Sequence, residues 1–87
     1  MEQEFIVANK KGLHARVAAQ IVRIATQYQA DVWIFKGGIK VDAKSILDVL
    51  TLASPHGSRL LVSTEGPDAG TVMEALAALF QAKFGEE

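Results

Sequence analysis

The sequence predicts an α+β fold of order βαββαβα, in which three helices cover one face of a four-stranded sheet. Three observations lead to this prediction. Four short segments carry the apolar pattern of strands, three others repeat apolar residues at helical spacing, and turn-forming residues separate the segments. Because a helix buries one stripe and a sheet buries one face, these elements favour a layered architecture around one core.

The four expected strands are short. Residues 4–8 form an apolar run that a lysine and glycine turn interrupts. Residues 31–36 are rich in aromatic and β-branched side chains, and the glycine pair 37–38 suits a tight hairpin into residues 39–41. Residues 59–64 alternate on a period of two. We therefore expect an antiparallel sheet.

The clearest helix spans residues 15–28, where apolar side chains fall on one side and polar side chains on the other. A short second helix should begin at Ser45, because Ser45 and Asp48 have the spacing of a capping box, and end near Pro55. Asp68 is expected to cap the last helix. The apolar stripe of that helix consists of Val72, Met73, Leu76, Leu79 and Phe80.

Composition narrows the classes of protein. The chain has 87 residues, which is enough for one core and too few for two, so we expect a single domain over residues 1–87. It holds no cysteine and no cluster of metal ligands, so we expect no disulfide, metal or cofactor. The net charge of −1 and the lack of a long apolar run argue against binding to nucleic acid or membrane. We expect a soluble, cytoplasmic protein.

The residue with the clearest chemical potential is His14, which lies where a glycine loop meets the start of the strongest helix. A helix start presents unpaired backbone N–H groups and a partial positive charge, which suit a phosphate attached to a side chain there. We expect the N–H groups of Ala15 and Val17 to be among these donors. The guanidinium of Arg16 adds a fork of donors that matches phosphate oxygens. The pattern indicates a histidine that becomes phosphorylated, without the second group that hydrolysis would need.

Four segments extend this interpretation. Residues 12–16 (GLHAR), 18–19 (AA), 44–46 (KSI) and 65–66 (EG) stand in an order and at spacings that resemble the HPr family. This family is the histidine-containing phosphocarrier of the bacterial phosphoenolpyruvate-dependent phosphotransferase system. The resemblance covers essentially the whole chain and implies an open-faced β-sandwich.

The resemblance also implies a function. His14 would accept a phosphoryl group on Nδ1 from phosphorylated enzyme I and pass it to a IIA-type acceptor, and Arg16 would steady the charge of the group in transfer. The chain would be a stoichiometric carrier and not an enzyme, most simply a monomer, and would act in sugar uptake or in a regulatory, nitrogen-type phosphorelay. The alternative is a non-catalytic α/β binding module that uses His14 only as a structural residue.

Two positions depart from the family pattern. The family usually has proline where this chain has Val17, so the first helical turn regains a backbone donor and loses rigidity. Ser45 matches a serine that a regulatory kinase phosphorylates in many Gram-positive members, but a helix cap is the simpler role. Asp48, where glycine is more common, favours that simpler role because its carboxylate would repel a phosphoserine.

The short helix is apolar around most of its circumference. A helical wheel groups Ile46, Val49, Leu50 and Ala53 toward the core, with Leu47 partly outward and Leu52 on the opposite flank. A partner patch that includes Leu47 and Leu50, near His14, would then dock enzyme I and the acceptors. The alternative is a helix that is buried more completely.

Overall fold

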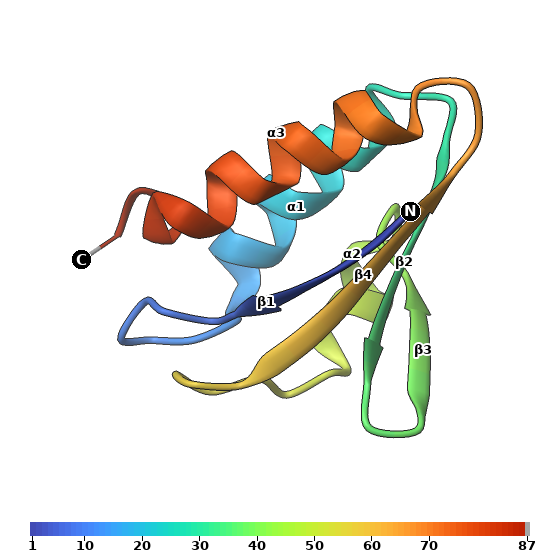
Figure 1. The fold of residues 1–87 in the computed structure, drawn as a ribbon. Coiled ribbons are helices and arrows are strands. Elements are labelled where there is room, and N and C mark those ends of the chain that lie inside the picture. Colours follow the sequence, from blue (N-terminus) through green and yellow to red (C-terminus); the bar gives the residue numbers. More distant parts are fainter. Residues whose placement is uncertain (87) are drawn as a thin grey trace.

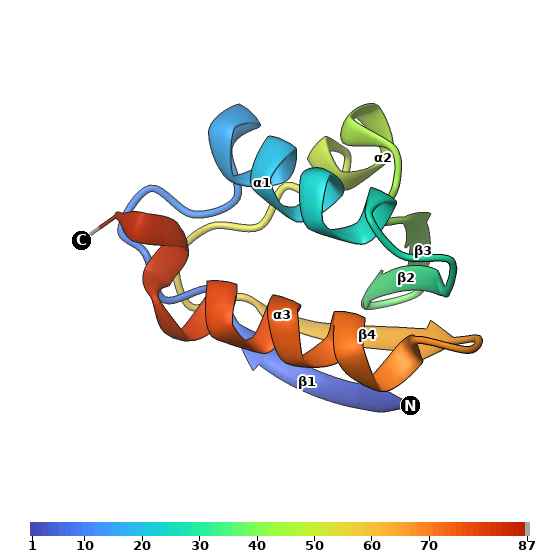
Figure 2. The same cartoon turned by 90° about the horizontal axis from the view of Figure 1, so that it is seen from above.

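The structure, a computed structural model, describes residues 1–86 and confirms the element order βαββαβα (Figure 1). Helices α1, α2 and α3 lie on one side of the sheet, as the view from above shows (Figure 2). A short 3-10 turn, η1, follows α3. The elements are β1 (Glu2–Ile6), α1 (Ala15–Thr26), β2 (Asp31–Lys36), β3 (Ile39–Asp42), α2 (Ile46–Leu50), β4 (Arg59–Glu65), α3 (Ala69–Gln81) and η1 (Lys83–Gly85).

The sheet has the strand order β1-β4-β2-β3, and all of its neighbours pair antiparallel. The last strand in the chain therefore lies in the middle of the sheet, between the first strand and the hairpin of β2 and β3. In the register of the two central strands, Ile34 pairs with Val62, and Phe5 at the β1 edge pairs with Leu60. All four side chains are buried, so one face of the sheet forms the floor of the core.

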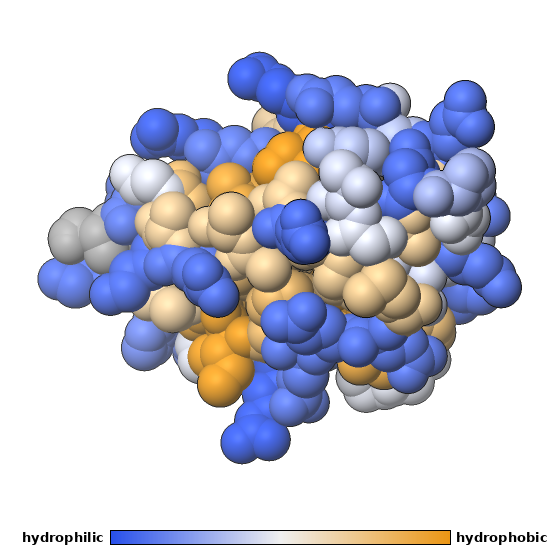
Figure 3. Space-filling view, turned by 45° about the horizontal axis from the view of Figure 1, so that its top comes forward, coloured by the Kyte–Doolittle hydropathy of each residue, from blue (hydrophilic) through white to orange (hydrophobic). Residues whose placement is uncertain are grey.

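The core lies between this sheet face and the helices. Ile21 of α1 and Leu76 of α3 are fully buried over the sheet. The ring of Phe80 stacks on Phe5, with centroids 4.6 Å apart, and Phe84 meets Phe80 edge-on at 4.9 Å. Outside this core, apolar surface forms a band between hydrophilic side chains, as one face of the molecule shows (Figure 3). The aromatic contacts fix the segment after α3 against the sheet.

Within the described residues 1–86, the opposite face of the sheet carries no helix, which confirms the open-faced arrangement (Figure 1). Trp33 and Phe35 of β2 lie half-buried on this face. The ammonium group of Lys40 lies 4.4 Å from the Trp33 ring centroid and 5.9 Å from that of Phe35. A lysine stem over two rings covers apolar surface that would otherwise face water.

Several expected elements have different ends, although β3 and β4 each run only one residue further than expected. Strand β1 spans Glu2–Ile6 and not residues 4–8, because its pairing with β4 runs from Glu2 opposite Ser63 to Ile6 opposite Arg59. Helix α1 ends at Thr26 and not at residue 28. The N–H of Gln27 bonds to Ile24 O at 3.1 Å, a tighter spacing that closes the helix.

Helix α2 departs furthest from its predicted end. It stops at Leu50 rather than near Pro55, and the chain then turns through Ala53, whose φ is +45°. Because the helical wheel no longer applies beyond Leu50, two expected orientations are wrong. Leu52 is buried at 3% exposure, and Ala53 is exposed.

Within α2 the inward side is also narrower than expected. Val49 is fully buried and Leu50 is half-buried against the core, as the spacing predicts. Ile46, which was expected to face the core, is 41% exposed at the first position of this five-residue helix. Leu47 is 77% exposed. The exposed apolar pair of this helix is therefore Ile46 and Leu47.

Asp68 precedes α3 as predicted, but its side chain does not cap that helix. Its carboxylate instead accepts hydrogen bonds from the backbone N–H of Gln29 at 2.9 Å and of Ala30 at 2.8 Å. The Gln29 hydrogen bond, with a smaller contribution from Ala30, holds the pKa of the Asp68 carboxyl below its usual range. The aspartate thus ties the start of α3 to the loop between α1 and β2.

Candidate functional site

His14 is the N-cap residue of α1, as the sequence predicts. Its backbone is extended, with φ −106° and ψ −177°, and its carbonyl accepts the first helical hydrogen bond from Ala18 N at 2.9 Å. The N–H groups of Ala15, Arg16 and Val17 therefore have no partner within the helix. The imidazole makes no capping bond to these groups, so they stay available beside it.

The loop before His14 is held tightly. Gly12 has a φ of +72°, and a Cβ there would lie 2.6 Å from the carbonyl oxygen of Ser54. The N–H of Leu13 donates to that same oxygen at 2.8 Å. The buried side chain of Asn9 donates to Gly12 O at 2.8 Å. A short glycine loop, braced from two sides, therefore delivers His14 to the helix start.

A second segment reaches His14 from the far end of the chain. A carboxylate oxygen of Glu86 lies 2.7 Å from His14 Nε2, and its other oxygen accepts a hydrogen bond from Asn9 Nδ2 at 2.9 Å. Sequence reasoning missed Glu86 because it lies 72 residues from the histidine. No local motif connects the two, and only the packing of the segment after α3 brings them together.

The charge state of Glu86 follows from its surroundings. The hydrogen bond from Asn9, above all, lowers the pKa of the Glu86 carboxyl, and the His14 ring and the charge of Arg16 act in the same direction. The group is therefore a carboxylate at neutral pH. Because a carboxylate can only accept, the hydrogen of this contact lies on His14 Nε2. In the neutral form of the ring, Nδ1 is then the nitrogen with a free lone pair.

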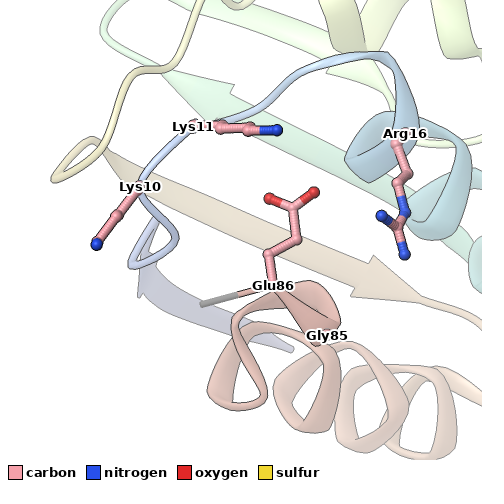
Figure 4. A pocket seen from close by; sticks show the side chains of 5 residues that line it. All are labelled: Lys10, Lys11, Arg16, Gly85 and Glu86. Carbon is pink, nitrogen blue, oxygen red and sulfur yellow. The ribbon is translucent and has the colours of Figure 1, made fainter.

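A basic pocket of about 290 Å³ adjoins this pair. It is lined by Lys10 and Lys11 from the loop after β1, by Arg16 from α1, and by Gly85 and Glu86 from the end of the chain. In Figure 4 the Glu86 carboxylate points into the space between Lys11 and Arg16, and the Lys10 ammonium points away from it. The side chains that line the pocket carry three positive charges and one negative charge, so the pocket suits a further anionic group.

The remaining predicted residues lie nearby or serve the fold. Arg16 and Ala15 are exposed beside His14, whereas the side chain of Val17 is fully buried and only its backbone faces the helix start. Ser45 Oγ accepts a hydrogen bond from Asp48 N at 3.3 Å, which is half of the expected capping box. Its own N–H bonds to Asp42 O at 3.1 Å, so the Asp48 side chain does not complete the box.

Two classes of site find no support in residues 1–86. No three histidine, cysteine, aspartate or glutamate side chains of this part of the chain gather as metal ligands would. Within the same range, every helix is too short or too polar to span a lipid bilayer.

Fold and site together define a small α+β protein with a single histidine at a helix start, next to a basic pocket. The family model described as the PTS HPr component phosphorylation site matches residues 1–82. The chain therefore belongs to the HPr family.

Known HPr proteins are similar to this chain in sequence and in structure over nearly its full length. The chain is 40% identical to the phosphocarrier protein HPr of Xylella fastidiosa, over 100% of this chain and 98% of the relative. A crystal structure of HPr-C-His from Thermoanaerobacter tengcongensis matches with a TM-score of 0.96 at 39% identity, covering 100% of this chain and 98% of the other. A structure of an HPr dimer from the same organism matches with a TM-score of 0.80 at 41% identity over 90% of each chain.

Proposed function

We propose that this protein is a phosphocarrier of the phosphotransferase system that accepts a phosphoryl group on His14 from phosphorylated enzyme I and passes it to a IIA-type acceptor. One observation carries the proposal: His14 caps α1 with Nε2 engaged by Glu86, and three cationic side chains line the adjoining pocket. The protein acts as a stoichiometric carrier, since it is phosphorylated once and dephosphorylated once in each cycle.

The chemistry needs few groups. The Nδ1 lone pair of His14 attacks phosphorus, a nitrogen to phosphorus bond forms, and the bond to the donor breaks with its electron pair returning to the donor. Arg16 and the unpaired N–H groups at the helix start donate hydrogen bonds to the negatively charged phosphoryl oxygens. Reversal of the same steps delivers the group to the acceptor, and no water takes part.

Docking of the protein partners uses the exposed side of α2. Leu47 is exposed, Leu50 is half-buried beside it, and Ile46 adds to the apolar surface. Helix α2 packs against α1, the helix that His14 caps. A small apolar area beside a charged reaction centre is typical of transient protein interfaces. We propose that enzyme I and the IIA-type acceptor share this patch.

The phosphotransferase system has more than one branch in which this carrier could act. The carrier serves sugar uptake or a regulatory, nitrogen-type relay, and Val17 and Asp48 favour a specialised member. Ser45 acts as a helix cap in this proposal, because its hydroxyl already accepts a bond from Asp48 N. Phosphorylation assays with enzyme I of each branch, and with an HPr kinase, separate these roles.

The function is tested by incubating the protein with labelled phosphoenolpyruvate and enzyme I. We expect an acid-labile phosphate on the wild-type protein that disappears in His14→Ala. His56→Ala is the matched control, because His56 is exposed on a loop, and it should retain the label. Absence of label on the wild type with enzyme I of both branches would contradict the proposal and favour a binding module.

A further inference from the structure

The contact between Glu86 and His14 is part of a built arrangement. Phe84, two residues earlier, is fully buried and packs edge-on against Phe80. The carbonyl of Phe84 accepts a hydrogen bond from Gln20 Nε2 of α1 at 3.1 Å. The end of the chain is thus tied to both α3 and α1 just before Glu86. The position of the Glu86 carboxylate follows from these anchors.

Both carboxylate oxygens of Glu86 have specific partners. One accepts from Asn9, whose amide also donates to the loop at Gly12, and the other meets His14 Nε2. The Glu86 side chain is only 14% exposed, against 33% for His14. A carboxylate held on two sides and largely shielded from water constrains the ring more than a mobile surface ion pair does.

We propose that Glu86 is a positioning residue for phosphoryl transfer: its carboxylate holds the proton of His14 on Nε2 and serves as counter-ion to the ring while Nδ1 carries the phosphoryl group. This inference rests on the proposed phosphocarrier function and extends it to a residue at the far end of the chain. The role is analogous to that of a carboxylate that orients a histidine by its second nitrogen.

The step balances without a mobile proton. Before transfer the ring is neutral, with a hydrogen on Nε2 and a lone pair on Nδ1. When Nδ1 forms its bond to phosphorus, the ring gains positive charge, and the Nε2–H of the ring then faces the negative charge of Glu86. When the bond to phosphorus breaks, its electron pair returns to Nδ1 and the ring is neutral again. Glu86 keeps its hydrogen bond throughout.

Glu86 also bears a charge of the same sign as the phosphoryl group, so the two effects must be compared. The carboxylate lies on Nε2, on the other side of the ring from Nδ1, and contacts the ring hydrogen directly. Lys10, Lys11 and Arg16 line the space around it and offset repulsion toward the phosphoryl oxygens. The direct, charge-assisted hydrogen bond is therefore the larger effect.

The first test reads the proton position in the unphosphorylated protein. Glu86→Gln keeps the size of the side chain, but Asn9 should hold the new amide oxygen, which turns the amide NH₂ toward His14 Nε2. At about pH 9, where free histidine is neutral, ¹⁵N shifts of the His14 ring should show the proton on Nε2 in the wild type. In Glu86→Gln a large fraction should move to Nδ1. Unchanged ring shifts in that variant would overturn the inference.

The second test reads the phosphorylated state. Glu86→Gln should lower the equilibrium fraction of phosphoryl group that the protein holds against enzyme I, by roughly tenfold in the equilibrium constant. Glu74→Gln, on an exposed position of α3, makes the same charge change and should match the wild type. Equal phosphoryl retention in Glu86→Gln would overturn the inference, and greater retention would overturn it and mark Glu86 as an inhibitory anion.

The two proposals fail in different ways. If the wild type takes no phosphoryl group at all, the phosphocarrier function fails, whatever the ring shifts show. If the wild type is phosphorylated normally and Glu86→Gln behaves as Glu74→Gln does, the function stands and the role of Glu86 is refuted. Melting temperatures of both variants close to that of the wild type show that the comparison concerns the site and not the fold.

Discussion

Arg16 is the side chain whose loss should change transfer without changing the fold. It is exposed at the helix start and lines the basic pocket. We expect Arg16→Gln to lower the rate of phosphoryl transfer by about 10-fold to 100-fold, because one charge-assisted pair of hydrogen bonds to the phosphoryl oxygens is lost. Rapid-quench assays with enzyme I measure this rate. Arg23→Gln, exposed in the last turn of the same helix, should leave it unchanged.

Val17 offers a backbone donor where the family usually has proline. Its N–H is the third of the unpaired groups after the His14 cap, a position that commonly donates to a group on the cap side chain. We expect Val17→Pro to fold and to be phosphorylated, with a phosphohistidine lifetime shortened by roughly fivefold through the loss of one hydrogen bond. Hydrolysis of the isolated phosphoprotein measures the lifetime. A lifetime and transfer rates equal to those of the wild type would refute a role for this N–H.

At this scale the sequence predicts some residues and not others. His14 and Arg16 stand together in a local motif, so spacing alone indicates their chemistry. Glu86 has no such neighbour, because its contact with His14 depends on how Phe84 packs in the core. Asp68 shows the same limit. Its position suits a helix cap, but its carboxylate instead accepts two hydrogen bonds from the loop after α1.

Among the elements, the loop that leads into α1 depends on Gly12. A methyl group there would collide with the Ser54 carbonyl, and the φ of +72° already disfavours other residues. We expect Gly12→Ala to lower the free energy of unfolding by about 2 kcal/mol or more. Gly37→Ala is the matched control, since its φ is +61° and nothing lies within 4 Å, so about 1 kcal/mol is expected there. Urea unfolding compares the two. Equal losses would show that contact with Ser54 does not matter.

Asp68 ties the start of α3 to the loop between α1 and β2, and its effect on stability should depend on pH. Its pKa is lower in the fold than in the unfolded chain, so its contribution to stability is complete above the unfolded pKa and is lost as pH falls through the folded pKa. Urea midpoints of the wild type should therefore fall between about pH 5 and pH 2. Asp68→Asn should be less stable at pH 7 and show a weaker pH dependence. A parallel pH profile for the two proteins would contradict this.

Among the elements, those that end at a clear turn signal were predictable, and the short helix α2 was not. β2 has the predicted bounds because aromatic and β-branched residues end at a glycine pair. α2 is only five residues long, so a helical wheel drawn past Leu50 assigned Leu52 and Ala53 to the wrong sides. In a short apolar segment the tertiary contacts, and not the period, decide which side is buried.

Over the whole molecule, the antiparallel order β1-β4-β2-β3 and the packing of α3 bring two distant parts of the chain to one end. The loop between β1 and α1 lies beside the segment after η1 (Figure 2), and His14 at the end of that loop contacts Glu86. Because this meeting requires the complete fold, the site forms only when β1 and the final segment are both in place.

The distribution of exposed apolar side chains over the molecule bears on its oligomeric state. In residues 1–86 the large apolar side chains that are exposed are Met1, Ile6 in β1, Ile39 in β3, and Ile46 and Leu47 in α2, and their division among separate elements argues against a stable dimer. The terminal ammonium group of Met1 donates a hydrogen bond to Thr64 O at 2.7 Å, which extends the contact between the start of the chain and β4. We expect a monomer by size-exclusion chromatography with light scattering, although one related HPr structure is a dimer. A dimeric mass that persists on dilution would contradict this.

The phosphorylated nitrogen can be observed itself. Protein with ¹⁵N-labelled histidine, phosphorylated by enzyme I and phosphoenolpyruvate, gives a coupling between ³¹P and the ring nitrogen that carries the group. Because Glu86 engages Nε2, the coupling should appear at Nδ1 of His14 and leave Nε2 protonated. A coupling at His14 Nε2 or at His56, or a phosphate on Ser45 alone, would contradict the proposed carrier site.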